Sequence, residues 1–287
     1  MAAIHQPNLF PRLSTLAKLY AADAWIVLDT VQHAARDHQH RTRLANLDGT
    51  ETQWLTLPVH RPDGRATAID ALTLTDQAGS RRRVHNLLAH HYASAPHWPH
   101  VRDLAGQVGD VISATGHLST ISAVSTLALL RLLGWSGEVH HASALPTRTG
   151  RSTRLADLSA TIGAHTYLCG PGGSRYLDST PFNQLGLQVQ HFLTPGPEDA
   201  QAWTAARKIS SLWAMATTGP DELRNLLERV RAELRSAMAP PCRSAPAMAG
   251  RLHRPDALGA VKPRRANETD PERVDARLDS PWHAPGL

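Results

Sequence analysis

Short apolar runs alternate with helix-like segments along most of the chain. Ala24-Trp25-Ile26-Val27-Leu28 is an unbroken apolar run, typical of a strand buried on both faces of a parallel sheet. Between such runs, apolar residues recur every three or four positions, as on one face of a helix. We predict strands at residues 2–4, 24–28, 54–59, 69–74, 138–141, 166–169 and 187–192. We predict helices at residues 13–22, 82–92, 101–114, 119–133, 152–162 and 218–238.

This alternation predicts an α/β fold, with a mainly parallel sheet flanked by helices in a Rossmann-like arrangement. The order of the strands cannot be read from the pattern. The last predicted helix has Thr217 or Thr218 as a candidate cap and Pro220 in its first turn. Its leucines fall at helical spacing, so we expect it to dock on the body through one apolar stripe.

Composition changes at Pro240. The segment from there to the end holds 8 of the 20 prolines and no Phe, Tyr or Ile. Such a segment cannot bury enough apolar area to offset the entropy lost on ordering. We therefore predict an α/β domain over residues 1–239 and a disordered tail rich in Pro and Arg over residues 240–287.

The formal net charge of +5 raises the question of a nucleic-acid partner. Only three of the basic residues are lysines, and the arginines are spread along the chain without a basic stripe. Because phosphate-backbone binding needs clustered charge, we do not favour nucleic acid as the main partner. Two cysteines, no signal-peptide pattern and no long apolar window favour a cytoplasmic protein without a membrane partner. The oligomeric state is left open.

Polar and glycine residues follow several of the predicted strands. In an open parallel sheet, ligands bind beyond the carboxyl ends of the strands. We expect the proline-braced loop after the first strand and the glycine turn after residue 169 to meet at one edge of the sheet and form one pocket. The residues that follow the strands are His5, Gln6, Pro7, Asn8 and Pro11, then Asp29 and Gln32, then Ser143, and then Gly170, Gly172 and Gly173.

Each of these residues also has a structural interpretation. His5 can be a hydrogen-bonded residue at a strand end, and Asp29 can be a cap. The glycine turn can be a tight turn, which we favour slightly over a cradle for an anion. The run over residues 36–43 can be a solvated loop. The histidines lack Cys, Asp or Glu at ligand spacing, so we predict no metal, and the sequence names no cofactor.

Two stretches near the start are similar to a known family. Ile4-His5-Gln6-Pro7-Asn8-Leu9-Phe10-Pro11 and Asp23-Ala24-Trp25-Ile26-Val27-Leu28-Asp29-Thr30-Val31-Gln32 resemble the opening of the WbqC-like protein family, which has His-Gln-Pro-Asn-Tyr-x-Pro and Asp-x-Phe-Val-x-Leu-Asp-Asp-Val-Gln there. The resemblance continues at Gln39-His40-Arg41-Thr42-Arg43, at Trp54-Leu55-Thr56-Leu57-Pro58-Val59 and at Tyr167-Leu168-Cys169-Gly170-Pro171-Gly172-Gly173 with Tyr176-Leu177-Asp178. It covers about residues 2–238.

The chain departs from the family pattern at several positions. Leu9 stands for the Tyr after Asn, and Arg12 for an aromatic residue. The other departures are at Thr30, for the second Asp, at His40 and Thr42, for two Asn, and at Trp213, for an acidic residue. We expect from them either a different ligand from that of most relatives or a paralogue without the family activity.

The resemblance implies a transferase that attaches an activated acyl, aminoacyl or nucleotidyl group to a sugar or small-molecule acceptor in polysaccharide or specialised-metabolite biosynthesis. A fainter resemblance to the nucleotidylyltransferase and synthetase superfamily implies phosphate contacts from Ser152, Thr153 and Arg154. On this hypothesis His5 and Asp29 are catalytic. The substrate-binding set is Gln6, Asn8, Gln32, Arg41, Arg43, Ser152, Thr153, Arg154, Gly170, Gly172, Gly173, Tyr176 and Asp178. The alternative is a non-catalytic nucleotide or sugar-phosphate binding protein of a biosynthetic complex.

Overall fold

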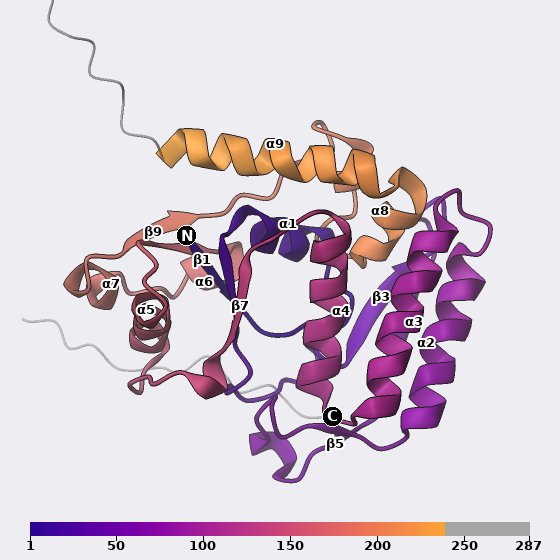
Figure 1. The fold of residues 1–287 in the computed structure, drawn as a ribbon, viewed down its shortest axis with the longest axis horizontal. Coiled ribbons are helices and arrows are strands. Elements are labelled where there is room, and N and C mark those ends of the chain that lie inside the picture. The colour runs from indigo at the N-terminus through magenta and orange to yellow at the C-terminus, as the bar shows by residue number, and fades with distance from the viewer. Residues whose placement is uncertain (239–287) are drawn as a thin grey trace, which may run out of the picture. The chain divides into compact units, whose positions relative to one another are not determined.

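The computed structural model describes residues 1–238. Its centre is a sheet of five strands in the order β7-β2-β1-β8-β9, and all four neighbouring pairs are parallel. The predicted mainly parallel sheet flanked by helices is confirmed (Figure 1). The predicted tail at residues 240–287 lies outside the described residues. The strands are β1 (Ala2–His5), β2 (Ala24–Val27), β7 (Glu138–His141), β8 (Thr166–Cys169) and β9 (Gln188–His191).

Successive side chains of a strand point to opposite faces of the sheet, so an apolar strand gives the sheet two apolar faces. Helices cover both of them. Ala3 and Trp25 pack into a large core with the helices of one face, and Ile4 and Ile26 pack into a smaller core on the other. The longer helices are α1 (Leu13–Ala21), α2 (Gln77–Tyr92), α3 (Trp98–Ala114), α4 (Leu118–Leu132), α5 (Arg151–Thr161), α8 (Ser211–Thr218) and α9 (Pro220–Met238). Two shorter helices are α6 (Pro171–Ser174) and α7 (Thr180–Gln184), and single 3₁₀ turns occur at Gly64–Ala66, Ala142–Ala144 and Gln201–Trp203.

The two predicted strands in the middle of the chain are wrong in their extent. Residues 54–59 do not form one strand: β4 (Thr52–Thr56) ends before Pro58, which has no N–H to donate, and β5 (Val59–His60) is separate. β4 pairs antiparallel with β3 (Arg41–Ala45), which the sequence analysis considered a loop. In residues 69–74 only β6 (Thr73–Leu74) is a strand. Ile69 and Leu72 are both buried at a spacing of three, because the chain turns there.

The predicted cap of the last helix is also wrong. Thr217 and Thr218 belong to α8, and the Thr217 hydroxyl donates to the carbonyl of Trp213. Gly219, at φ 87°, separates α8 from α9. The expected apolar stripe of α9 does pack against the body: Leu223, Leu226 and Leu227 are buried, and the hydroxyl of Tyr20 in α1 donates to Glu228 at 2.6 Å. None of the helices in residues 1–238 has the length and apolar character that a membrane crossing needs.

Candidate functional site

A cleft of about 920 Å³ opens at the carboxyl ends of β1 and β8. The two strands are neighbours in the sheet, so the loops that follow them lie side by side. The histidine loop and the glycine turn line this same cleft, as the sequence analysis expected. The predicted site residues that line it are His5, Gln6, Gln32, Arg154, Gly170, Gly172 and Gly173.

The loop after β1 is held in one conformation. Phe10 has φ 42°, which is strained for a residue with a side chain, and it lies just before Pro11. Three hydroxyl groups hold its backbone: its N–H donates to Ser125 Oγ at 2.9 Å, and its carbonyl accepts from Thr42 and Ser210, both at 2.9 Å. The loop that carries His5 therefore reaches the cleft from a rigid base.

The protonation of His5 follows from its surroundings. Its Nδ1 lies 2.8 Å from the carbonyl oxygen of Gln6, which can only accept, so Nδ1 carries the hydrogen and Nε2 is an acceptor. Burial, followed by the charge of Lys18, lowers the pKa of His5 to about 3. The structure therefore holds a neutral imidazole, because its charged form would be desolvated next to cations.

Gln6 is oriented by a buried partner. The side-chain amide of Gln39 donates to Gln6 Oε1, and the Gln39 carbonyl accepts from Ser122 in α4 at 2.6 Å. Gln39 is almost wholly buried, so its position is set by packing. Because the Gln6 oxygen is engaged, its NH₂ group is left as a donor at the cleft. Gln39 belongs to a stretch that resembles the family, but it is not one of the predicted site residues.

The cleft is strongly basic. It is lined by Arg12, Lys18, Arg151, Arg154 and Arg207. Among the described residues Asp37 is the acidic residue that lines it. Burial lowers the pKa of Arg12, and the Asp37 carboxylate offsets part of this effect. Arg12 also donates to the carbonyl of Arg207 at 2.9 Å. The arrangement favours an anion, because an unpaired excess of cations raises the local concentration of negative ligands.

Lys18 was missed by the sequence analysis. It lies in α1 with 5% of its surface exposed, and its Nζ donates to the carbonyl of Ile4 at 3.2 Å. Burial lowers the pKa of this ammonium to about 8. A signal was present: Lys18 is one of three lysines in the chain and lies between the apolar residues Ala17 and Leu19 of a helix that is buried almost throughout.

Asp29 lies at the same edge of the sheet but does not line the cleft. Its carboxylate, 3% exposed, turns toward β7, where it accepts from His141 Nδ1 at 3.0 Å, from the Ser143 N–H at 3.0 Å and from the Ser143 hydroxyl at 2.9 Å. Burial would raise the pKa of Asp29, but these hydrogen bonds lower it below its usual value. The hydrogen bond to Asp29 in turn raises the pKa of His141.

Several other predicted residues have structural contacts away from the cleft. Arg41 donates to the carbonyls of Asp37 and Arg36 and stacks on Trp54 at 4.2 Å, and Arg43 stacks on the same ring at 4.7 Å. Arg41 therefore braces the loop that brings Asp37 to the cleft. The remaining residues of this group are Asn8, Ser152, Thr153, Tyr176 and Asp178.

Four residues of this last group have contacts that define their local roles. Asn8 is buried, and its carbonyl accepts from the hydroxyls of Ser125 and Thr126. The hydroxyl of Ser152 accepts from the Asp178 N–H, and Asp178 accepts from the N–H of Thr180 at the start of α7. Tyr176 is 66% exposed under Arg151. These contacts link the glycine turn to α5, whose residue Arg154 does reach the cleft.

The departures from the family pattern divide into two groups. Arg12 lines the cleft and adds to its positive charge. Thr42 donates to the carbonyl of Phe10, His40 pairs with His33 at 3.1 Å, and Trp213 donates to the carbonyls of Asn46 and Leu47. These three residues, Leu9 and Thr30 do not line the cleft. The departure that changes the chemistry of the cleft is therefore the arginine.

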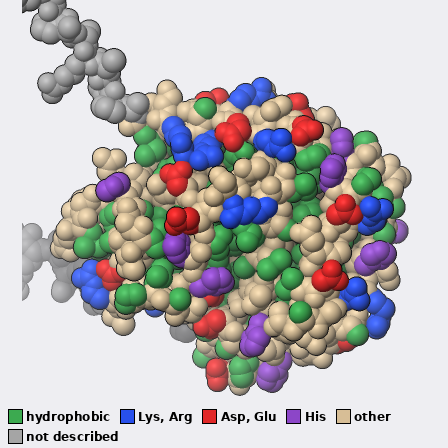
Figure 2. Space-filling model, viewed as in Figure 1, with side chains coloured by type: hydrophobic (Ala, Val, Ile, Leu, Met, Phe, Trp, Pro, Cys, Tyr) green, Lys and Arg blue, Asp and Glu red, His purple; other side chains and the backbone are tan. Residues whose placement is uncertain are grey.

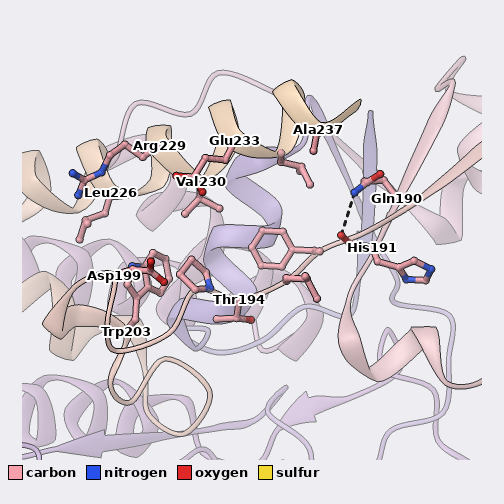
Figure 3. A pocket seen from close by; sticks show the side chains of 14 residues that line it. Gln190, His191, Thr194, Asp199, Trp203, Leu226, Arg229, Val230, Glu233 and Ala237 are labelled. Carbon is pink, nitrogen blue, oxygen red and sulfur yellow. Dashed lines mark hydrogen bonds between the residues drawn. The ribbon is translucent and has the colours of Figure 1, made fainter. Parts of the chain in front are cut away.

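A second cavity of about 490 Å³ lies between α9 and the segment after β9 (Figure 3). Arg229, Val230 and Glu233 of α9 face it, and no predicted site residue lines it. Phe192 and Thr194 line both cavities, so this segment separates them. On the face drawn in Figure 2, basic and acidic side chains are interspersed. Within residues 1–238 no group of three or more His, Cys, Asp or Glu is arranged to hold a metal ion.

The fold and the cleft define a class: an α/β protein with a basic cleft at the carboxyl edge of a parallel sheet. The model of the WbqC-like protein family matches residues 6–225, and the chain belongs to this family. A relative from Mycobacterium tuberculosis (strain ATCC 25618 / H37Rv), called "Uncharacterized protein Rv1507c", is 27% identical over 227 residues, which are 77% of this chain and 96% of that protein. No solved structure gives a significant match.

Proposed function

We propose that the protein is a transferase that binds an activated, phosphate-bearing donor in the basic cleft and passes its acyl, aminoacyl or nucleotidyl group to a small-molecule acceptor. The observation that carries this proposal is the charge of the cleft: Arg12, Lys18, Arg151, Arg154 and Arg207 against Asp37. Positioning and charge neutralisation are what transfer from a phosphate-bearing donor requires. The cleft is also large enough for a nucleotide-sized ligand, since such pockets span about 300–1,000 Å³.

His5 supplies the acid–base group in this proposal. Its Nδ1–H is engaged by Gln6, so Nε2 is the atom that can accept a proton from the acceptor's hydroxyl or amine. Burial, followed by the surrounding cations, keeps this nitrogen a weak base. Binding of an anionic donor offsets those cations and raises its basicity. The Gln6 amide, held by Gln39, provides a donor beside it.

Binding is tested by thermal unfolding of the full chain with ATP, a non-hydrolysable aminoacyl-adenylate analogue, a nucleotide sugar and coenzyme A. A ligand at a hundred times its dissociation constant stabilises by about 2.7 kcal/mol, a rise in Tm of about 5–10 °C. Arg154→Gln should abolish most of the shift. Arg83→Gln, an exposed arginine in α2, is the matched control and should keep it. A chain that responds to none of these anions, or variants that respond equally, would contradict the proposal.

Catalysis is tested with the donor so identified. His5→Ala should lower turnover about 10²–10⁴-fold and leave the thermal shift in place, because the residue acts on the proton rather than on the anion. A second candidate function, a binding protein without catalysis, is favoured by one observation: Asp29 contacts His141 and Ser143 instead of His5. If the donor stays intact with every acceptor offered to the wild-type chain, this second function is the correct one.

A further inference from the structure

Lys18 is a charged side chain in an apolar setting. It lies in α1, where Leu16, Ala17 and Leu19 are all buried, and it keeps only 5% of its own surface exposed. An ammonium removed from water loses several kcal/mol of hydration unless a partner replaces the water. A methionine or leucine at this position would avoid that loss, so the lysine needs a reason other than stability.

The hydrogen-bond partners of Lys18 do not replace the hydration that its ammonium loses on burial. An ammonium has three hydrogens to donate, and one hydrogen bond is formed, to the carbonyl of Ile4 at the end of β1. None of the salt bridges found within residues 1–238 involves Lys18. Asp37, the acidic residue of the cleft, acts on Arg12. Two N–H groups of the ammonium are thus left for a ligand.

The Lys18 ammonium lies at the floor of the cleft. Lys18 lines the cleft, while Arg151 and Arg207, on the same cleft, are exposed. The glycine turn passes directly over it: a Cβ placed on Gly170 would lie 3.4 Å from Lys18 Cδ and 3.7 Å from Nζ. Because Gly170 has no side chain, a ligand that enters along the turn can reach the ammonium.

We infer that Lys18 is a substrate-binding residue that holds an oxyanion group of the ligand, a phosphate or a carboxylate, at the floor of the cleft between β1 and β8. The inference rests on the proposed function, because it names the residue to which the anionic end of the substrate binds. The arginines at the rim then bind other parts of the ligand. The free energy lost by burying the ammonium is recovered when the anion is bound.

The first test uses the ligand-free full chain. Lys18→Met removes the desolvated charge and shortens the unbranched side chain by one atom, so we expect Tm to rise by about 2–4 °C. Lys208→Met, at an exposed lysine, is the matched control and should leave Tm unchanged. Lys18→Gln keeps a donor toward the Ile4 carbonyl without the charge, and it serves where the methionine variant does not fold. If both variants lower Tm, Lys18 is a structural residue and the inference is overturned.

The second test measures binding of inorganic phosphate and of acetate by calorimetry. Phosphate reports a phosphoryl group and acetate a carboxylate, so the preferred anion identifies the group that Lys18 holds. We expect Lys18→Met and Lys18→Gln to weaken binding of the preferred anion at least about tenfold, while Lys208→Met does not. Unchanged affinity in the Lys18 variants, with Arg154→Gln still impaired, overturns the inference and leaves the proposed function standing. If the wild-type chain binds neither anion, both the inference and the proposed function are overturned.

Discussion

Two pairs of strands present their carboxyl ends at the same edge of the sheet, but one pair leaves polar groups free for a ligand and the other pair uses them in internal hydrogen bonds. At β1 and β8 the edge is open: His5 is neutral, Lys18 has donors to spare, and a cleft separates the loops. At β2 and β7 the edge is closed, because Asp29 is saturated by His141 and Ser143. The comparison shows that polar residues after a strand do not by themselves make a site. The site is where their hydrogen-bonding capacity is left unused.

Removing the carboxylate of the closed side should have the largest effect on stability. Asp29→Ala removes a buried carboxylate and leaves the Ser143 N–H and His141 without the acceptor to which they donate. We expect the free energy of unfolding to fall by about 1–3 kcal/mol, measured by urea denaturation, because three hydrogen bonds to a buried carboxylate are lost. The control is Asp178→Ala, an exposed carboxylate with one backbone partner, which should cost about 1 kcal/mol or less. Equal losses in the two variants would mean that the Asp29 cluster is not a stabilising unit.

The two sides should also differ in how they respond to pH. The pKa of His5 is lowered to about 3 by burial and the charge of Lys18. At this position the unfolded chain is protonated below about pH 6.5, whereas the folded chain stays neutral until about pH 3. The free energy of unfolding therefore decreases as the pH drops from 6.5 toward 3, by up to about 1.4 kcal/mol per pH unit. The pKa of His141 is raised by its hydrogen bond to Asp29. Its contribution is complete below pH 6.5 and is lost as the pH rises through the folded pKa.

Urea midpoints at pH 8, 6.5 and 5 separate these contributions. His5→Gln should reduce the loss of stability between pH 6.5 and 5 without abolishing it, because one depressed imidazole is gone while burial still lowers the pKa of His38 and of His40 to about 4. His141→Gln should leave that loss in place and remove the gain between pH 8 and 6.5. Identical pH profiles for the two variants would contradict the opposite protonation behaviour assigned to the two sides.

The smallest effect is expected from two neighbouring glycines of the open side. A Cβ on Gly173 would lie 3.0 Å from Sγ of the buried Cys169, whereas a Cβ on Gly172 has no atom within 4 Å. Gly173→Ala should therefore destabilise by about 1 kcal/mol, and Gly172→Ala by less than about 0.5 kcal/mol. Both residues line the cleft, so Gly172→Ala should weaken ligand binding without the loss of stability. Equal stabilities of the two variants would show that the turn adapts to the added methyl group.

Much of the fold could be predicted from local pattern. The apolar run at β2 and the mainly apolar runs at β1 and β8 predict strands, because a strand buried on both faces of a sheet is mostly apolar. The loop that carries His5 could be identified in the same way, since it follows such a run and is bracketed by prolines. The hairpin of β3 and β4 was missed because its arginines suggested solvent, although Thr42 and Leu44 alternate with them and are buried.

The sequence by itself determined the five strands of the central sheet and most of the longer helices, that the sheet is mainly parallel, and that a histidine loop and a glycine turn end two of its strands. Only the tertiary structure decided that β8 lies beside β1 and β7 beside β2, which joins His5 to the glycine turn and sends Asp29 to His141. Only it placed Lys18 and Arg12 at the cleft. The physical reason is that an element's type depends on the spacing of its own apolar residues. Strand order depends instead on packing between residues more than a hundred positions apart, which no local pattern encodes.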